Sequence, residues 1–479
     1  MTDFESSETW PTDEVLGEPI EEDVDHPNEA RVGWGVDRRK FLALAGGLGT
    51  AGVLSATLGP RLWEGFFSSP SKAPAPLKLA LSPKPAVSQA SSSAKKPLIL
   101  VTLYGGNDGL NTVIPYQTSI YESNRGTLAI DPSKVLPLGD GYGLHPSMPG
   151  FKKLWDAKQL AVIQGVGFAN PNYSHFESMD IWQSGVPGEP VSSGWLGRWL
   201  DATNSSPLKA VSIGPTMPTL LTGVRVQGAA IPPGKLVLPG DSTEQLLFAT
   251  LSQINSGEPQ LLSEAAAASS NLIQLSHQMG PTLSRTATSD PLHLKDANPN
   301  SLAANGGAAL AIANGGGGQS TPNVLATQLS IVANLILAGA VPQVYSVELG
   351  GFDTHVNQLT TQERLLGELD AAVTAFVEAM ANTPQGNDAV VMIYTEFGRR
   401  VSANSSAGTD HGWANNVLIT GPTVKGGFYG EPSDLARLQE GNLVFTTDFR
   451  TVYATLFDKV LGVDPKPFLQ GSFNSFSMV

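Results

Sequence analysis

The chain of 479 residues contains no cysteine. This absence excludes disulfide bonds and thiolate metal ligands, so a metal ion would have to be held by histidine, carboxylate, amide or hydroxyl groups. Histidine is also scarce, with seven in the whole chain. Four of them stand in short polar motifs beyond the N-terminal region: His145, His175, His355 and His411. Any metal chemistry therefore depends on very few imidazole groups.

Basic residues are few. The chain has 29 Lys and Arg against 43 Asp and Glu, which gives a net charge of −14. No basic stripe is evident, so the composition argues against a nucleic-acid partner. Part of the acidity is local, because residues 1–37 hold 12 acidic side chains and one arginine. That stretch has little apolar periodicity, and we expect it to be a disordered, solvated tail.

Near the N-terminus, a long hydrophobic run is missing. The uncharged apolar segment Leu44–Gly59 is Gly-rich and shorter than the ~20 residues that a membrane-spanning helix needs. It follows the paired basic residues Arg38 and Arg39, a pattern typical of a twin-arginine export signal over residues 38–63. A Pro-, Ser- and Ala-rich linker or cleavage region then extends over residues 64–96.

This signal predicts export by the twin-arginine translocase, with transient membrane contact through the signal segment. The expected location is periplasmic or extracellular. The alternative is a signal that remains uncleaved and anchors the protein in the membrane.

Three common catalytic or nucleotide-binding patterns are absent from the sequence. No Gly-x-Ser-x-Gly elbow is present, which argues against an ordinary esterase. The turn at Gly165-Val166-Gly167 lacks the third glycine of a dinucleotide-binding loop, and Gly234-Lys235 is followed by leucine instead of the hydroxyl residue of a P-loop. A nucleotide cofactor is therefore not expected.

Strand-like and helical segments alternate beyond residue 96. Continuous apolar strands that alternate with helices predict a mainly parallel α/β sheet with helices on both faces. We expect one such domain over residues 97–479, with a helical and Gly-rich insertion at about 220–320. Helical spacing of apolar residues is clearest at Asn323–Ala340, Glu363–Met380 and Thr451–Leu461. Strands are expected at Leu98–Tyr104, Leu160–Gly165, Ala210–Ile213, Val344–Leu349, Ala389–Thr395 and Val417–Thr420.

Acidic residues and histidines follow three of the expected strands. Asp353 and His355 follow one, Asp410 and His411 follow the next, and Asp108 follows the first. Residues two apart in an extended chain point the same way, so Asp353 and His355 can share one cation. The side chains of the adjacent residues Asp410 and His411 point in different directions. They can therefore bind two neighbouring ions, or one can bind an ion while the other supports a residue that binds it. We therefore predict a site at the carboxyl edge of the sheet for one or two divalent ions: zinc, manganese, calcium or magnesium.

Ser174 and His175 form a second candidate motif. Ser174 precedes a predicted helix, and Glu177 follows three residues later as in a capping box, so Ser174 can serve as a helix cap. A helix N-terminus also favours phosphate or sulfate oxygens, so a hydroxyl there, next to a metal, can act as a nucleophile. Both roles remain open, and His175 is a candidate catalytic residue beside it.

Glu396 and Arg399 follow the strand that leads to Asp410. Glu396 is a candidate metal ligand or a carboxylate behind the ligands. Arg399 is a candidate for bidentate binding of an anionic substrate. The alternative is that Glu396 and Arg399, three residues apart, only pair with each other.

The mature part of the chain resembles a bacterial family of exported proteins known as domain of unknown function number fifteen hundred and one. That family is related to the alkaline phosphatase–sulfatase superfamily. The motifs that carry the resemblance are Leu103–Asn111, Tyr173–Phe176, Gly350–His355, Thr395–Arg399 and Gly408–Gly412.

The resemblance implies an alkaline phosphatase-like fold and two divalent cations around a phosphoryl or sulfuryl group. It places Asp108, Asp353, His355, Asp410 and His411 at the metal positions, with Ser174 as nucleophile. One departure is that no histidine follows His411, whereas the superfamily has a further downstream ligand, so either His175 or His145 substitutes for it or the second metal site is lost. The expected function is an exported metal-dependent hydrolase of phosphate or sulfate esters acting on an anionic small-molecule or polymer substrate. The alternative is a non-catalytic cell-envelope protein that keeps the fold and a structural metal.

Overall fold

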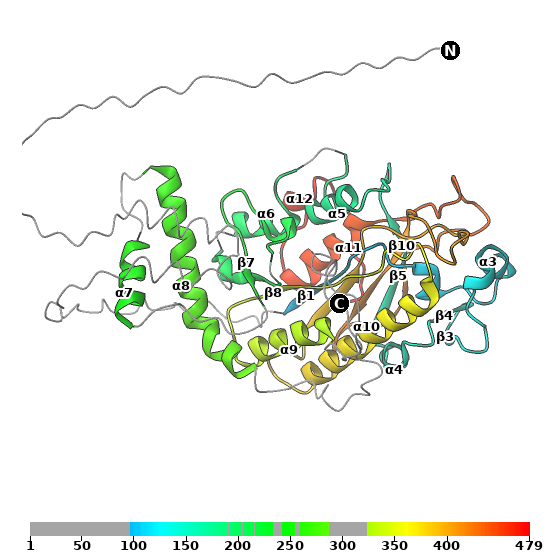
Figure 1. Cartoon of the computed structure of the whole chain (residues 1–479), viewed down its shortest axis with the longest axis horizontal. Coiled ribbons are helices and arrows are strands. Elements are labelled where there is room, and N and C mark those ends of the chain that lie inside the picture. The colour runs from blue at the N-terminus through cyan, green and yellow to red at the C-terminus, as the bar shows by residue number, and fades with distance from the viewer. Residues whose placement is uncertain are drawn as a thin grey trace, which may run out of the picture.

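The computed structural model describes residues 96–188, 191–203, 205–214, 216–232, 242–253, 259–286 and 323–479 (Figure 1). The predicted acidic tail, the export signal and all but the last residue of the linker lie outside these residues. The Gly-rich part of the predicted insertion also lies outside them. No helix within the described residues is long and apolar enough to cross a membrane.

A nine-stranded sheet forms the centre of the protein. Neighbouring strands are parallel except at β10, which runs antiparallel to both β5 and β9. In spatial order the strands are β11 (Gly427–Tyr429), β5 (Leu160–Gly167), β10 (Asn415–Thr420), β9 (Val390–Tyr394), β1 (Leu98–Leu103), β8 (Val344–Leu349), β6 (Ala210–Ile213) and β7 (Ala229–Ile231), with β12 (Thr447–Asp448) paired to β5. The mainly parallel sheet predicted from the sequence is confirmed.

Strand β1 lies inside the sheet and shows why both faces are covered. All of its residues are buried. Ile99 and Val101 belong to one hydrophobic core cluster, whereas Leu98 and Leu100 belong to a second. Because side chains alternate across a strand, the uninterrupted apolar run of β1 supplies both clusters.

Helices pack on both faces of the sheet, as predicted (Figure 1). The cluster that contains Ile99 also receives side chains from α4 (Pro149–Asp156), α8 (Gln260–Thr286), α9 (Val324–Leu337) and α10 (Gln358–Ala381). The cluster that contains Leu98 receives side chains from α5 (His175–Ser184), α6 (Trp195–Ala202), α11 (Phe449–Leu456) and α12 (Lys466–Leu469).

Smaller elements surround the main sheet. An antiparallel sheet consists of β2 (Val113–Ile114), β4 (Tyr142–Leu144) and β3 (Leu136–Gly139), and α3 (Ser119–Arg125) lies between β2 and β3 in the chain. The described part of residues 220–320 includes β7, α7 (Ser242–Leu251) and α8. Strand β7 pairs with β6, so this region adds a strand to the main sheet as well as helices beside it.

The three predicted helices are present, but two of them begin earlier than predicted. Helix α10 begins at Gln358 and not at Glu363, because the buried amides of Gln358 and Gln362 hydrogen-bond to the loop after β1. Helix α11 begins at Phe449, where the Asp448 side chain caps it by accepting from a backbone N–H of the first turn. Polar contacts define these helix starts, whereas apolar spacing indicates only the helix middles.

His145 lies between β4 and α4 and is 4% exposed. Its Nδ1 accepts a hydrogen bond from the Ser147 N–H at 3.2 Å. Burial lowers the pKa of its imidazole to about 4, and the charge of Asp108 opposes this shift only in part. The folded protein therefore keeps His145 neutral under conditions where the unfolded chain, with a pKa of 6.5, binds a proton. Between the folded pKa of about 4 and the unfolded pKa of 6.5, the free energy of unfolding therefore falls as the pH falls.

We expect the His145→Asn variant, which keeps an acceptor for Ser147, to be less sensitive to acid. Between about pH 7 and about pH 5 it should lose about 2 kcal/mol less unfolding free energy than the wild type. Urea unfolding of both proteins at the two pH values measures this difference. Equal losses in the two proteins would contradict the prediction.

Candidate metal centre

The loops that follow β1, β8 and β9 meet at the carboxyl edge of the sheet. Two glycines permit their close approach. A Cβ atom at Gly105, where φ is +116°, would overlap the backbone of Asp353, and one at Gly408 would overlap the backbone of His355. Any larger residue would push these loops apart.

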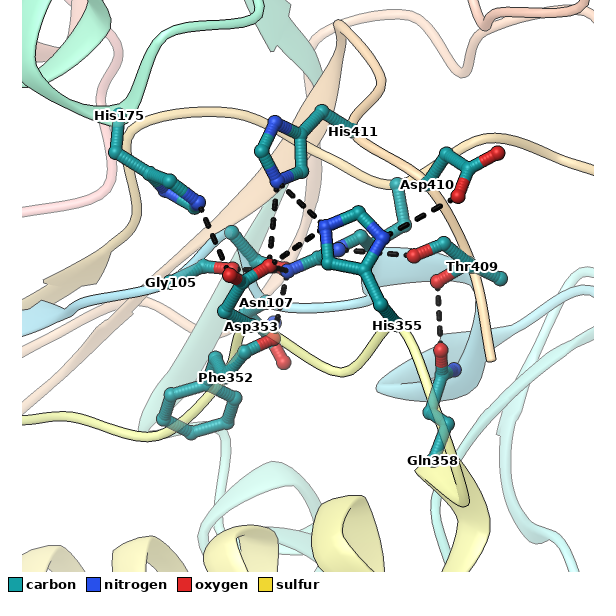
Figure 2. Close-up of polar contacts among 12 residues, drawn as sticks. Gly105, Asn107, His175, Phe352, Asp353, His355, Gln358, Thr409, Asp410 and His411 are labelled. Carbon is teal, nitrogen blue, oxygen red and sulfur yellow. Dashed lines mark hydrogen bonds and ion pairs between the residues drawn. The ribbon is translucent and has the colours of Figure 1, made fainter. Parts of the chain in front are cut away.

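Three imidazole rings turn toward the carboxylate of Asp353 (Figure 2). Nε2 of His355 lies 3.1 Å from Oδ1, and Nε2 of His411 lies 3.2 Å from the same oxygen. Nε2 of His175 lies 3.5 Å from Oδ2. The ligand atoms of His175, Asp353 and His411 all lie within 4.8 Å of one another. We call these three residues and His355 the metal centre, because together they form a candidate site for a metal ion.

Each ring of the metal centre is held in place through its other nitrogen. Nδ1 of His175 lies 2.7 Å from Oε1 of Glu396, and Nδ1 of His355 lies 3.2 Å from Oδ1 of Asp410. Nδ1 of His411 lies 2.7 Å from the carbonyl oxygen of Tyr173. All three partners are acceptors, so a ring that carries its proton on Nδ1 would present the Nε2 lone pair to a cation. Metal-binding histidines are oriented in the same way.

The donor set fits a divalent cation. Nε2 atoms of His355 and His411 lie 2.9 Å apart, and two lone pairs at this distance repel each other unless a proton or a cation lies between them. Nε2 of His175 is buried and has no hydrogen-bond partner among the described residues. A cation bound by these nitrogens and by Asp353 would satisfy all of them.

The electrostatic surroundings also favour a positive charge. Burial raises the pKa of Asp353, but its polar contacts with His175, His411 and Arg399 outweigh burial and hold the pKa well below its usual range. For His175, burial lowers the pKa, yet the nearby carboxylates of Asp353 and Glu396 reverse the effect and raise the pKa to about 9. The same carboxylates would stabilise a bound cation.

Arg399 does not take the substrate-binding role predicted for it. The residue is 2% exposed, and its guanidinium donates five hydrogen bonds within the protein. The acceptors are the carbonyl oxygens of Gly105, Gly106, Phe352 and Thr409 and Oδ1 of Asp353 at 2.7 Å. All three nitrogens of the group donate within the protein, so Arg399 holds the loops together and positions Asp353. The alternative pairing of Arg399 with Glu396 is not seen either.

Asp108 is not brought to the metal centre. Its carboxylate is fully buried and pairs with Arg125 on α3, with N–O distances of 2.8 and 2.6 Å. It also accepts from Gln358 and from the Leu110 N–H at 3.2 Å. Our prediction of a metal ligand is corrected here, because both oxygens are already engaged by an internal cation and amide donors. Asp108 therefore joins the β1 loop to α3 and α10.

Ser174 lies at the N-cap of α5, immediately before His175. Its Oγ accepts from the Glu177 N–H at 3.4 Å, and its own N–H donates to Oδ1 of Asn172 at 2.6 Å. The predicted cap is therefore present. The distance of 3.4 Å is long for a hydrogen bond, so the hydroxyl is only weakly engaged.

Glu396 and Asp410 lie behind the histidines and do not join the ligand cluster. Glu396 is 1% exposed, and Oε1 accepts from the Gly105 N–H at 2.8 Å in addition to contacting His175. Its Oε2 accepts from Thr395 Oγ1 at 2.7 Å. Of the two roles considered for Glu396, the structure shows the second: its carboxylate holds the ring of His175 and is not itself in the ligand cluster. Asp410 holds His355 in the same manner.

Sequence reasoning missed some residues that shape the centre. Asn404 donates to the carbonyl oxygen of His355 at 2.9 Å and to Oδ1 of Asp410 at 3.3 Å. Tyr173 contributes only its backbone carbonyl to His411. Neither role has a signal in the sequence, because each depends on loops that meet only in the folded chain. The role of His175 did have a signal in the sequence, because His175 stands in a compact Asn- and Ser-containing motif.

We expect the Glu396→Gln variant to bind metal about 10- to 100-fold more weakly while keeping the same stoichiometry at saturation, because the His175 ring loses an anionic partner. Titration of the metal-free protein against a fluorescent chelator measures the dissociation constant. The matched control is Glu378→Gln, an exposed acid that pairs with Lys153 at 2.6 Å on the surface. An unchanged constant for Glu396→Gln would show that the carboxylate does not support the site.

Solved structures with a similar overall arrangement share little sequence with the chain. An alkaline phosphatase superfamily protein from Vibrio parahaemolyticus is 10% identical, with a TM-score of 0.35 over 78% of this chain and 68% of that one. A lipoteichoic acid synthase from Listeria monocytogenes is 10% identical, with a TM-score of 0.32 over 78% and 73%. Alkaline phosphatase from the Antarctic bacterium TAB5 is 10% identical, with a TM-score of 0.30 over 70% and 95%.

No curated protein matches the chain. A family match, in contrast, spans nearly the whole described region and includes every loop of the metal centre: residues 95–474 match the family described as "Protein of unknown function (DUF1501)". The resemblance inferred from the sequence motifs is thereby confirmed, and the chain belongs to this family.

Proposed function

We propose that the protein is a metal-dependent hydrolase of phosphate or sulfate esters. The observation that carries the proposal is the convergence of three imidazole Nε2 atoms on Asp353, with each Nδ1 held by an acceptor. His175, Asp353, His355 and His411 would hold the ion, and imidazole-rich donors suit zinc better than calcium or magnesium. When bound, a divalent ion supplies a Lewis acid that stabilises negative charge on an ester oxygen.

The surroundings of the centre support an anionic ester as substrate. Helix α5 begins at His175, so the positive end of a ten-residue helix lies beside the metal centre. Backbone N–H groups at such an end favour phosphate and sulfate oxygens. We propose Ser174, the cap of this helix, as the nucleophile. Export through the twin-arginine translocase also belongs to the proposal and rests on residues 38–63 alone.

The test uses the full chain purified without chelators. Elemental analysis would give the metal content, and hydrolysis of 4-nitrophenyl phosphate and 4-nitrophenyl sulfate would be followed after loading with zinc, manganese, calcium or magnesium. We expect metal-dependent release of nitrophenol that chelation abolishes and that added metal restores. Metal binding without hydrolysis of either ester, and of a wider ester panel, would refute the catalytic proposal.

A Ser174→Asn variant separates the two roles of this serine. Asparagine caps helices as well as serine does but has no hydroxyl, so we expect stability within about 0.5 kcal/mol of wild type. Turnover should fall by about 10³-fold or more if Ser174 is the nucleophile. Thermal unfolding and ester hydrolysis measure the two effects. Full activity of Ser174→Asn would limit Ser174 to capping.

One observation favours the alternative of a non-catalytic envelope protein with a structural metal. Arg399 follows the supporting carboxylate of Glu396 by three residues, is 2% exposed, and uses all three of its nitrogens in hydrogen bonds inside the protein, so it is not open to a substrate anion. That alternative predicts that metal removal lowers the melting temperature and that no ester is hydrolysed.

A further inference from the structure

One buried side chain connects the start of α10 to the loop that carries Asp410 and His411. Gln358 is the first residue of α10 and is fully buried, and its Oε1 accepts a hydrogen bond from Oγ1 of Thr409 at 2.6 Å (Figure 2). Its Nε2 donates to Oδ2 of Asp108. Thr409 is fully buried too and directly precedes Asp410 in the chain. Gln358 therefore lies between the buried carboxylate of Asp108 and the residue before Asp410.

The two partners of Gln358 fix the direction of its amide group. Asp108 pairs with Arg125 through both carboxylate oxygens and can only accept hydrogen bonds, so the NH₂ group of Gln358 must face it. The amide oxygen then faces Thr409, whose hydroxyl is the donor. A flipped amide would place its oxygen against the carboxylate of Asp108. The contact between Gln358 and Thr409 therefore has one arrangement, and it depends on the hydroxyl of Thr409.

Backbone hydrogen bonds tie the same loop to α10 and to the loop after β8. The Gln358 N–H donates to the carbonyl oxygen of Ala407 at 2.9 Å, and the Thr409 N–H donates to that of Thr354 at 3.1 Å. These bonds set the path of the loop up to Thr409. Thr409 is therefore fixed both through its backbone and, by Gln358, through its side chain.

We propose that Gln358 and Thr409 are positioning residues of the metal centre. Their hydrogen bond holds the chain at the point from which Asp410 and His411 extend. Asp410 orients the ring of His355 by its contact with Nδ1 at 3.2 Å, and Nε2 of His411 lies 2.9 Å from Nε2 of His355. Ligands of a metal site must be held to within about 0.5 Å, so a loop that moves further separates the nitrogens and weakens binding of the ion. The inference rests on the metal centre of the proposed function, but not on hydrolysis of an ester.

The test compares two substitutions of Thr409 in the full chain. Thr409→Val removes the hydroxyl and keeps the shape of the side chain, whereas Thr409→Ser keeps the hydroxyl. Each folded, metal-free protein would be titrated with zinc in competition with a fluorescent chelator. We expect Thr409→Val to bind zinc about tenfold more weakly at unchanged stoichiometry, and Thr409→Ser to recover the affinity of the wild type. A merely structural role would lower the melting temperature and leave the dissociation constant of the folded protein unchanged.

The matched control is Thr420→Val at the opposite edge of the sheet. Thr420 is also fully buried, and its Oγ1 donates to the carbonyl oxygen of Gln159 at 2.7 Å. It pairs with Leu160, the first residue of β5, and so lies at the amino edge of the sheet. This variant loses a buried hydroxyl of the same kind, and we expect it to lose stability but to keep the zinc affinity of the wild type.

Unchanged zinc affinity in Thr409→Val would overturn the proposal, and so would an equal loss of affinity in Thr409→Ser. If Thr409→Val fails to fold, as judged by circular dichroism, Thr409→Ala replaces it, because alanine removes the same hydroxyl and adds no group against Gln358. If the wild type binds no zinc, the proposed metal centre fails, and hydrogen exchange of the metal-free proteins decides the positioning role separately. Peptides that span residues 404–413 should exchange faster in Thr409→Val than in Thr420→Val. Equal exchange in the two variants would overturn the positioning role.

Discussion

Replacing His411 with alanine is expected to remove stoichiometric metal from the protein. Its Nε2 lies 3.2 Å from Oδ1 of Asp353 and 2.9 Å from Nε2 of His355, and its ring packs against that of His175, so it contacts all three other members of the cluster. Without it the ion would lose one nitrogen donor, and the two remaining imidazoles lie on opposite oxygens of Asp353. Elemental analysis of wild type and variant, purified side by side without chelators, measures the effect.

The matched control for this experiment is His277→Ala. His277 is an exposed histidine on α8, so its loss should leave the metal content unchanged. Thermal unfolding adds a second readout, because an ion at 100 times its dissociation constant stabilises the folded state by about 2.7 kcal/mol. Chelation should therefore lower the melting temperature of wild type but not of His411→Ala. Full metal retention in His411→Ala would refute the metal centre.

Replacing Asp108 with asparagine is expected to destabilise the fold by about 3–5 kcal/mol, because it leaves the charge of Arg125 buried without an anionic partner. Both side chains are at most 1% exposed, and Arg125 donates to both carboxylate oxygens. Asparagine keeps the volume of the side chain, so the effect reports the charge and not a cavity. Urea unfolding at neutral pH measures the change in free energy.

A surface pair is the matched control for Asp108→Asn. Asp434 and Arg437 lie 3.5 Å apart with side chains that are 55% and 88% exposed, so Asp434→Asn should change stability by less than about 0.5 kcal/mol. The metal content of the variant distinguishes the two roles considered for Asp108, a metal ligand or a buried partner of Arg125. We expect Asp108→Asn to retain its metal when folded. Loss of metal with little change in stability would restore the ligand role predicted from the sequence.

Much of the sheet was predictable because its strands are continuous apolar runs. Strands β6 and β8 have the predicted ends, Ala210–Ile213 and Val344–Leu349. Burial on both faces requires such runs, and the sequence shows them directly. The start of α10 was less predictable, since Gln358 looks like a surface residue until the β1 loop that it contacts is in place.

The site was predictable in part. Asp353, His355 and His411 do meet at the edge of the sheet, as strand ends carrying metal-type ligands suggested. The assignment of Asp108 was wrong because its partner, Arg125, lies on a helix of a different segment, and a pairing across 17 residues has no local signature. Arg399 was misassigned for a related reason, since the carbonyl oxygens that surround it become neighbours only when the loops close.

The ligands of the metal centre come from segments far apart in the chain. His175 is held by Glu396 across 221 residues, and His411 by the carbonyl of Tyr173 across 238. A nascent or unfolded chain therefore has no such site, and an ion bound there would enter only after the central sheet is complete. The identity of the bound metal would then be decided by the ions available in the compartment where the chain folds.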